Sequence, residues 1–492
     1  MNARDPANDR RLWRVANSIG EVVTGWPRAK DHVLPILFVR FLSDWHEETL
    51  AGYRRKYKGD PTRVGRAMRR ERFTVSEGNT FGDLCARRTL EDLGEKINST
   101  LRAIERANPH KLDGVFRSAD FNSLDLGNTS ERNARLRTLL ESFADFDFDA
   151  RRTRVTEWHA ALADLLITHF AEEAARRREP YYTPPEIAEL MTRLVEPISG
   201  DRIYDPTCGA GGLLVRTARA IPDENIALFG HESEHSTWAL CRMNLMLQNM
   251  DSASITKGDP IRQPTLADDS SLRKFQVVVS GAPFSLREWD ADSIKYDRFN
   301  RFRRGLPPKG SSDYLLITHV VETLDPTHGR ACIVAPLGTL FRGGSEGLIR
   351  TRLIEEGLLE GVVRLPSNLF FGTSIPVVLL LFRAARSDKA VFFIDASREF
   401  GSEKNRNRLR EEDVERIVTT WQSRAGHAGY SRLVPYEEIE ANEFNLNVPL
   451  YIKASDEGAM DLEAVAADIQ RLERELTETQ LNLTSALEKL RE

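Results

Sequence analysis

Short apolar segments alternate with amphipathic helical segments from about residue 166 to about residue 400. Strands that alternate with helices in this way pair into a mostly parallel sheet whose faces are covered by the helices. The alternation therefore predicts an α/β domain with a mostly parallel sheet over residues 166–400. Its strands are expected at residues 202–204, 227–230, 276–279, 331–335, 361–364 and 377–382.

The segment before this domain, residues 1–165, has a helical pattern instead. Apolar side chains such as those of Val33, Leu37 and Phe41 recur at helical spacing, which predicts an all-helical N-terminal domain. A basic run lies inside it. Most such runs are solvated helix faces, but this one could neutralise several phosphates. Its members are Arg54, Arg55, Lys56, Lys58, Arg63, Arg66, Arg69, Arg70 and Arg72.

Charge and cysteine usage limit the partners and the compartment. The chain has 69 Lys and Arg against 74 Asp and Glu, so a polyanion must be held by a local patch. Its four cysteines form no C-x-x-C pair, which fits neither a zinc knuckle nor a disulfide framework and favours a reducing compartment. The longest apolar run, residues 375–382, is too short to cross a bilayer. We expect a soluble, cytoplasmic protein without a metal or a membrane partner.

Two segments follow residue 400. Residues 401–455 open with a polar stretch and are expected to form a C-terminal extension. Residues 456–492 carry apolar side chains at three-, four- and seven-residue steps, which predicts a long helix. This helical tail could dock on its own domain or bind a partner, and its polar other faces favour a partner.

The most informative segment is IYDPTCGAGGLLV, residues 203–215. An apolar strand ends at Asp205, a loop containing Gly209 and Gly211 follows, and a helix begins at about Leu213. Glycines let a backbone approach a ligand closely, and a helix N-terminus presents free N–H groups to a carboxylate or phosphate. The segment predicts a nucleotide-type site, although many α/β folds use such a turn only for packing.

The next strand sharpens this prediction. It is followed by Glu232, whose carboxylate can accept both hydroxyls of a ribose. The spacing D-P-x-C-G-x-G-G departs from the G-x-G-x-x-G of dinucleotide sites. A methyl donor is therefore favoured over a nicotinamide cofactor.

Several blocks of the chain carry a family resemblance in order and spacing. They are LWRVANSIGEVVTGW with HVLPILFVRFLSDWHEE, EPYYTPPEIAELM, YDPTCGAGGLLV, PPKGSSDYLLITH, VAPLGTLFRGGSEGLIR, LPSNLFFGTSIP and NEFNLNVPLY. On these blocks the chain resembles the modification (M) subunit of type I restriction-modification systems, among the N6-adenine DNA methyltransferases. The resemblance implies a Rossmann-like class I S-adenosylmethionine-dependent methyltransferase domain over residues 166–400. It also implies that the helical domain before it makes DNA or partner contacts.

The resemblance also assigns residues to S-adenosylmethionine. Tyr182 and Thr183 would border its methionine part, Asp205, Gly209 and Gly211 would line it from below, Glu232 would hold the ribose, and Asp259 would lie near the adenine. Structural roles remain open for three of them. Tyr182 could be a core aromatic, Thr183 a helix cap before Pro184, and Asp259 a turn former.

The catalytic motif departs from the family's (D/N/S)-P-P-(F/Y/W). Gly281, Ala282, Pro283 and Phe284 stand there, so the side-chain acceptor for the target amine is missing. The Ala282 carbonyl could still accept one hydrogen bond, and Phe284 could still stack on an extruded base. Either Ser280 or another polar group restores the acceptor, or transfer has been lost. An engineered substitution, or a loop relaxed for another role, would also give this sequence.

A basic and aromatic segment, residues 295–304, follows the motif. Arg298, Arg301, Arg303 and Arg304 alternate with aromatic residues there, and we expect these arginines to contact DNA phosphates. The alternative is a surface helix with its aromatic rings turned inward.

The resemblance implies methyl transfer to adenine N6 in double-stranded DNA, within a phage-defence system. Its implied partners are a specificity (S) subunit, a second M subunit and a restriction (R) subunit. The alternative is a catalytically impaired homologue that binds cofactor or DNA as a structural or sensing module of a DNA defence complex. A nicotinamide-dependent oxidoreductase is less favoured, because the D-P and Y-T-P blocks have no role there.

Overall fold

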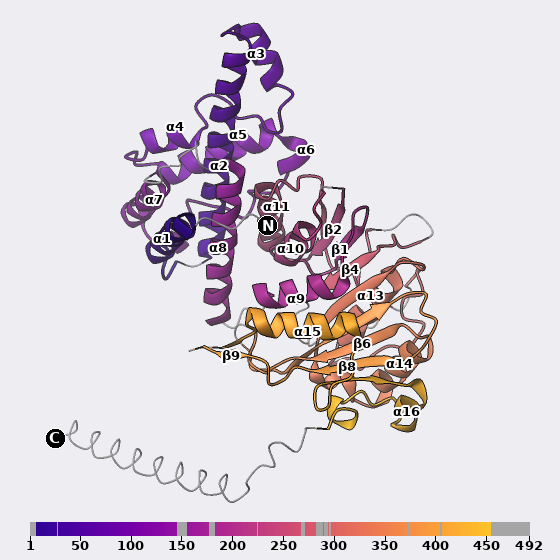
Figure 1. Cartoon of the computed structure of the whole chain (residues 1–492). Helices are drawn as coiled ribbons and strands as arrows, with labels where there is room; N and C mark the ends of the chain where they lie inside the picture. The colour runs from indigo at the N-terminus through magenta and orange to yellow at the C-terminus, as the bar shows by residue number, and fades with distance from the viewer. Residues whose placement is uncertain are drawn as a thin grey trace, which may run out of the picture.

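The computed structural model describes residues 6–26, 28–144, 155–176, 183–223, 225–266, 271–281, 289, 294, 297–370, 373–403 and 406–453. The helix predicted at residues 456–492 lies outside the described residues. The described chain forms a helical domain and a domain built on a sheet (Figure 1).

The helical domain follows from the apolar spacing of its longest helices. Its elements are α1 (Pro6–Val22), α2 (Ala29–Lys56), α3 (Pro61–Met68), α4 (Phe81–Ala86), α5 (Leu93–Ala107), α6 (Pro109–Leu112), η1 (Leu124–Leu126), α7 (Thr129–Ala144) and α8 (Val155–Arg176). Val33, Leu37 and Phe41 recur every four residues on α2 and are fully buried in one core with side chains of α8. Along α8, this core extends to Phe170.

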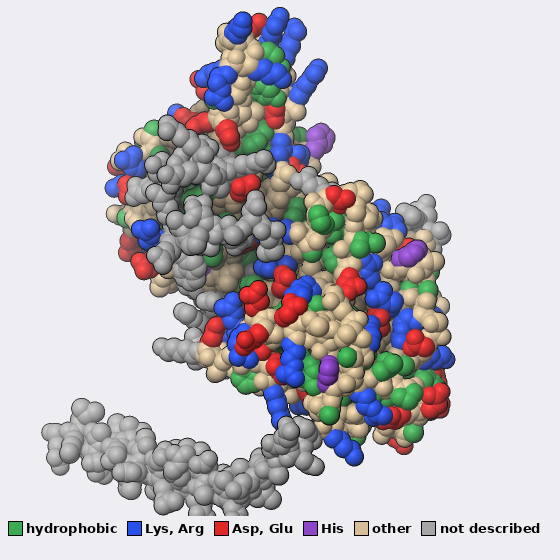
Figure 2. All heavy atoms as spheres, in the orientation of Figure 1, with side chains coloured by type: hydrophobic (Ala, Val, Ile, Leu, Met, Phe, Trp, Pro, Cys, Tyr) green, Lys and Arg blue, Asp and Glu red, His purple; other side chains and the backbone are tan. Residues whose placement is uncertain are grey.

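The basic run forms the tip of this domain. Asp60 accepts hydrogen bonds from the backbone N–H groups of Thr62 and Arg63, which caps α3 and turns the chain sharply after α2. The turn projects α3 away from the sheet, and Lys and Arg side chains gather over it (Figure 2). We call the exposed cations there the basic tip. They are Arg54, Arg55, Lys56, Lys58, Arg63, Arg66, Arg69 and Arg70.

The second domain contains a mostly parallel sheet. Its strands lie in the order β11-β8-β6-β7-β5-β4-β1-β2-β3, and all neighbours are parallel except the pairs of β7 with β5 and β6 and of β11 with β8. The strands are β1 (Arg202–Asp205), β2 (Ala227–Glu232), β3 (Ser254–Lys257), β4 (Val277–Ser280), β5 (Arg330–Pro336), β6 (Leu359–Arg364), β7 (Val377–Arg383), β8 (Val391–Asp395) and β11 (Ser431–Val434). The predicted Rossmann-like fold is confirmed.

Helices cover both faces of this sheet. Side chains along each strand alternate between two cores, so that Ile203 packs with α9 (Pro185–Val195), α10 (Gly212–Arg219) and α15 (Glu411–Ser423). Its neighbour Tyr204 faces the other core, with α13 (Asp313–Thr323) and α14 (Gly344–Glu355). Figure 1 shows α9 and α15 side by side on one face.

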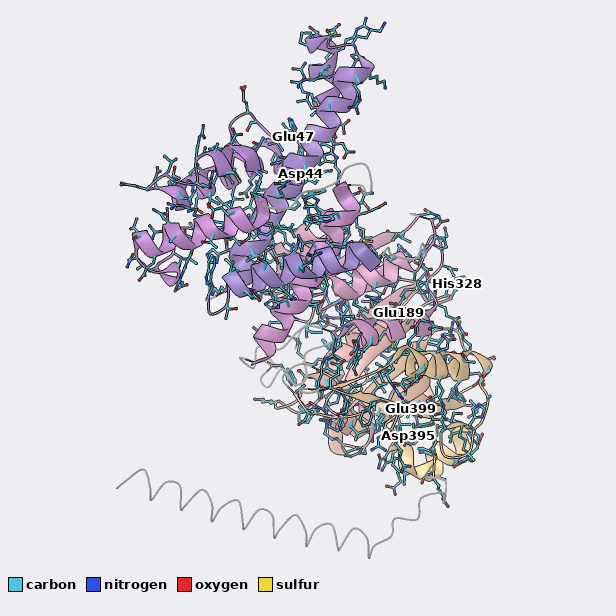
Figure 3. The ribbon with its side chains drawn as sticks, turned by 60° about the vertical axis from the view of Figure 1, so that its left-hand side comes forward. Asp44, Glu47, Glu189, His328, Asp395 and Glu399 are labelled. Atoms are coloured by element: carbon cyan, nitrogen blue, oxygen red, sulfur yellow. The ribbon has the colours of Figure 1, made fainter. Side chains whose placement is uncertain are left out.

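The extension after residue 400 belongs largely to this domain. A short hairpin of β9 (Gly401–Ser402) and β10 (Asn407–Arg408) leads into α15, and β11 then pairs with β8 at the sheet edge. Glu399, which follows β8 (Figure 3), accepts a hydrogen bond from Arg416 of α15 at 2.6 Å. The last described elements are α16 (Tyr436–Ala441) and η3 (Val448–Leu450).

The two domains meet along α11 (His235–Leu247). Met243 and Met246 of this helix join the core of the helical domain, whereas Cys241 and Leu245 join a core of the sheet. In Figure 3, Glu189 of α9 lies between α2, which carries Asp44 and Glu47, and Asp395 of the sheet. Among the described helices, none is both long and apolar enough to span a membrane.

Candidate functional site

The glycine loop after β1 lies where the strand order reverses. Strands β1 and β4 are neighbours there, one connecting toward β2 and the other toward β5, and ligands of α/β sheets bind at the carboxyl ends of such strands. Gly209 and Gly211 have positive φ values of 53° and 81°, and α10 begins directly after them. A side chain at Gly211 would place its Cβ 2.9 Å from Cys241 Sγ. The loop thus requires glycine both for its conformation and for its packing.

Two carboxyl groups flank this loop. Asp205, at the end of β1, is 1% exposed and accepts a hydrogen bond from the Thr207 N–H at 2.9 Å. Burial raises the pKa of Asp205 to about 7. Glu232 ends β2 and accepts from the Glu234 N–H at 2.8 Å, and burial raises its pKa as well. Both predicted acids therefore flank the loop, Asp205 buried and Glu232 partly exposed.

Asp259 lies next to them, after β3. The Gly258 N–H donates to the Glu232 carbonyl at 2.9 Å, which holds the start of this loop against the end of β2. One oxygen of Asp259 accepts from the Ile261 N–H at 2.8 Å, so the residue does form a turn. Its other oxygen lies 3.5 Å from Arg262 Nε on the surface.

Thr183 and Gly281 lie in contact beside β4. A Cβ built on Gly281 would lie 1.9 Å from Thr183 Oγ1 and 3.1 Å from Thr183 Cβ. Thr183 does not cap α9, since Pro184 occupies the N-cap position without a side-chain hydrogen bond. The structure thus brings the Y-T-P block and the catalytic block together. The other predicted members, Tyr182, Ala282, Pro283 and Phe284, lie outside the described residues.

Ser280, just before Gly281, is turned into the domain. Its Oγ lies 3.0 Å from Thr207 Oγ1, and the residue is 0% exposed. This contact ties the end of β4 to the loop after β1. Ser280 therefore supports the site from below and does not face its opening.

The four arginines predicted to contact DNA fall into two pairs. Arg301 and Arg304 are each 2% exposed, whereas Arg298 and Arg303 are exposed. Arg304 forms ion pairs with Glu322 and Glu356. Because their guanidinium groups are buried and paired, Arg301 and Arg304 are not surface cations in this structure.

Arg301 belongs to a buried network that the sequence analysis missed. Its Nη1 lies 3.1 Å from His319 Nδ1, and Tyr204 OH lies 3.1 Å from His319 Nε2 and 3.0 Å from His231 Nδ1. Burial lowers the pKa of His231 to about 4 and that of His319 well below its usual value, so both rings are neutral at neutral pH. Arg301 also donates to the carbonyls of residues 260 and 261. The network thereby supports the loop that carries Asp259.

Two family models match the chain. The N-6 DNA methylase model matches residues 161–459, which is more than half of the sequence, and the HsdM N-terminal domain model matches residues 8–143. The chain belongs to the N-6 DNA methylase family. The predicted resemblance to type I modification subunits is confirmed.

Individual relatives of this N-6 DNA methylase span similar lengths. It is 28% identical to a type I restriction enzyme MpnII methylase subunit of Mycoplasma pneumoniae, over 91% of this chain and 90% of the relative. It is 29% identical to a type I restriction enzyme HindI methylase subunit of Haemophilus influenzae, over 78% of this chain and 88% of the relative. Its fold matches the crystal structure of a type I restriction-modification system methyltransferase subunit from Streptococcus thermophilus, with a TM-score of 0.80 and 27% identity. The match covers 90% of this chain and 99% of that one.

Proposed function

We propose that this N-6 DNA methylase transfers a methyl group from S-adenosylmethionine to N6 of an adenine in duplex DNA. It would act as the modification subunit of a type I system, with the target sequence chosen by a separate specificity subunit. One observation carries the proposal. The glycine loop after β1, Glu232 at the end of β2, and the Thr183–Gly281 contact after β4 lie at the same end of the sheet, at the reversal of strand order.

The described residues fit the proposed cofactor. The Glu232 carboxylate is held by backbone N–H groups, so its oxygens are oriented to accept the two ribose hydroxyls. Gly209 and Gly211 put no side chain between the loop backbone and a ligand, and α10 begins directly after them, so its N-terminal N–H groups follow the loop. S-adenosylmethionine supplies an activated methyl group, and we assign Asp205, Asp259, Tyr182 and Thr183 to its surroundings as the family resemblance implies.

The transfer itself is a single displacement. The adenine N6 lone pair forms a bond to the methyl carbon, while the bond between that carbon and sulfur breaks and its electron pair stays on sulfur. The sulfonium becomes a neutral thioether, and the methylated amine loses one proton to water. N6 cannot be reached inside a duplex, so the base leaves the stack, and Phe284 is the proposed stacking ring.

We place the DNA contacts on exposed cations. Arg298 and Arg303 follow the catalytic block and are exposed, and the basic tip presents eight exposed cations on a chain whose net charge is −5. Phosphate contacts of this kind give affinity without sequence preference. Sequence choice by a specificity subunit, and assembly with a second M subunit and a restriction subunit, are part of this proposal.

The impaired-homologue alternative rests on Gly281 and Ala282. The family match and the relatives named as methylase subunits favour the enzyme. The test incubates the chain and its specificity subunit with labelled methyl donor and duplex DNA. Label on adenine is expected. Failure to transfer, with transfer gained by Gly281→Asn plus Ala282→Pro, would support the impaired homologue instead.

A further inference from the structure

The contact between Thr183 and Gly281 explains how a glycine can stand in the catalytic block. Gly281 follows β4 directly, and the space in which any side chain would begin is filled by the Thr183 hydroxyl. An asparagine carries its side-chain oxygen two bonds beyond Cβ. The Thr183 oxygen, 1.9 Å from the Cβ position, therefore lies in the same region as the missing oxygen.

The other described polar groups at the end of β4 are engaged elsewhere. Ser280 is fully buried, and its hydroxyl is paired with that of Thr207. Thr207 in turn hydrogen-bonds Asp205 through its backbone N–H. Thr183 is only partly buried, and within the described part of the chain its hydroxyl forms no hydrogen bond. It therefore remains available to a ligand.

We propose that the Thr183 hydroxyl replaces the side-chain acceptor that Gly281 lacks and accepts one N–H of the target amine. The inference rests on the proposed function and names a further catalytic residue for it. A hydroxyl oxygen has two lone pairs and can accept this bond while its own proton points to water. When the hydroxyl accepts this hydrogen bond, it localises the nitrogen lone pair and directs it toward the methyl group.

The same geometry makes the two positions a coupled pair. A side chain at residue 281 and the hydroxyl of Thr183 cannot occupy the observed positions together. The Thr183 hydroxyl can therefore accept the amine hydrogen bond only while residue 281 is glycine. Even Gly281→Ala, which adds one carbon, should displace the hydroxyl and impair transfer although it removes no polar group.

The test compares one substitution that keeps the shape of the Thr183 side chain with one that keeps its hydroxyl. Thr183→Val removes the hydroxyl, and Thr183→Ser keeps it, so both are assayed in the assembly with the specificity subunit for single-turnover methyl transfer. We expect Thr183→Val to lower the rate by about 10² to 10³, the usual loss for one preorganised polar group, and Thr183→Ser to recover most of it. Because Thr183 is also assigned to the surroundings of S-adenosylmethionine, calorimetry measures cofactor affinity for both variants, and the transfer rates are compared at saturating S-adenosylmethionine.

Each outcome has a separate meaning. Equal transfer rates for wild type and Thr183→Val would overturn the inference alone. A Thr183→Val defect seen wholly in cofactor affinity would also overturn it, because the hydroxyl would then serve the cofactor. No transfer by the wild-type assembly would overturn the proposed function, and the inference with it.

A double substitution tests the coupling. Gly281→Asn alone should lower the transfer rate, because its side chain collides with Thr183. Gly281→Asn with Thr183→Ala removes the collision and supplies the amide oxygen, so the double variant should exceed the activity of both single variants. Purely additive losses would count against a shared acceptor position.

Discussion

Arg301 Nη1 and His319 Nδ1 lie 3.1 Å apart in the interior of the sheet domain, at a place where sequence alone suggested a surface cation. His319 is a neutral acceptor there, because burial holds its pKa far below the usual value. Asp297, whose side chain is 8% exposed, balances the guanidinium charge through Arg301 Nε at 2.9 Å. Arg301 therefore belongs to a basic segment of the sequence but supports the loop after β3 from inside the domain.

Replacing Arg301 should therefore cost stability and not only DNA affinity. Arg301→Met leaves the Asp297 carboxylate buried without its partner, and we expect a loss of about 3–5 kcal/mol in the free energy of unfolding. Arg303→Met is the matched control, since its exposed ion pairs are worth about 0–1 kcal/mol. Urea denaturation measures both. Equal losses would contradict the buried role of Arg301.

The arginine segment shows what sequence reasoning could not supply. Arg303 and Arg304 share the partners Glu322 and Glu356, which lie on later elements, so nothing in the local sequence separates the exposed residue from the buried one. The contact of Thr183 with Gly281 is hidden for the same reason. It depends on how α9 crosses the end of β4, which no local pattern records.

The strands show where the sequence was sufficient. All six predicted strands are present, because central strands such as β5 are buried on both faces and form apolar runs. Three strands of this sheet, β3, β8 and β11, were not predicted. Strands β3 and β11 lie at the sheet edges and have exposed residues among their four, whereas β8 is buried and was overlooked although it is apolar. The predicted glycine loop has the expected place because its glycines are needed by the backbone itself.

Gly211→Ala separates the packing role of that glycine from its conformational role. Gly59 has nearly the same φ, 80° against 81°, but a Cβ there would meet nothing within 4 Å. Gly59→Ala should therefore cost only the conformational penalty, about 1–2 kcal/mol in the free energy of unfolding. Gly211→Ala should cost more, because its Cβ meets Cys241 Sγ, and should also weaken S-adenosylmethionine binding in calorimetry. Equal stability losses with unchanged cofactor affinity would contradict the assigned site.

Neutralising the basic tip should flatten the salt dependence of DNA binding. The variant changes Arg54, Arg55, Arg66 and Arg69 to Gln. The slope of the logarithm of the DNA association constant against the logarithm of the salt concentration should become shallower by up to about 0.9 for each phosphate that the variant no longer neutralises. The control changes Arg102, Arg135, Arg416 and Arg432 to Gln, which removes the same charge from exposed positions outside the tip. Binding of duplex DNA to the assembly is titrated at several salt concentrations. Parallel slopes for the two variants would show that the tip is only a solvated surface.

The Asp205 carboxyl should make stability fall as the pH rises toward neutrality. Below about pH 4 it is protonated in the folded and the unfolded chain. Its pKa is about 7 when folded and 3.8 ordinarily, so between these values only the unfolded chain releases the proton, and the free energy of unfolding decreases by up to roughly 4 kcal/mol. Asp205→Asn keeps the size of the side chain and removes this titration. The variant should therefore gain stability relative to wild type between pH 4 and 7 in urea denaturation without cofactor, and no further above pH 7. A constant difference between the two proteins across that range would show that the carboxyl titrates normally and is not desolvated beneath the glycine loop.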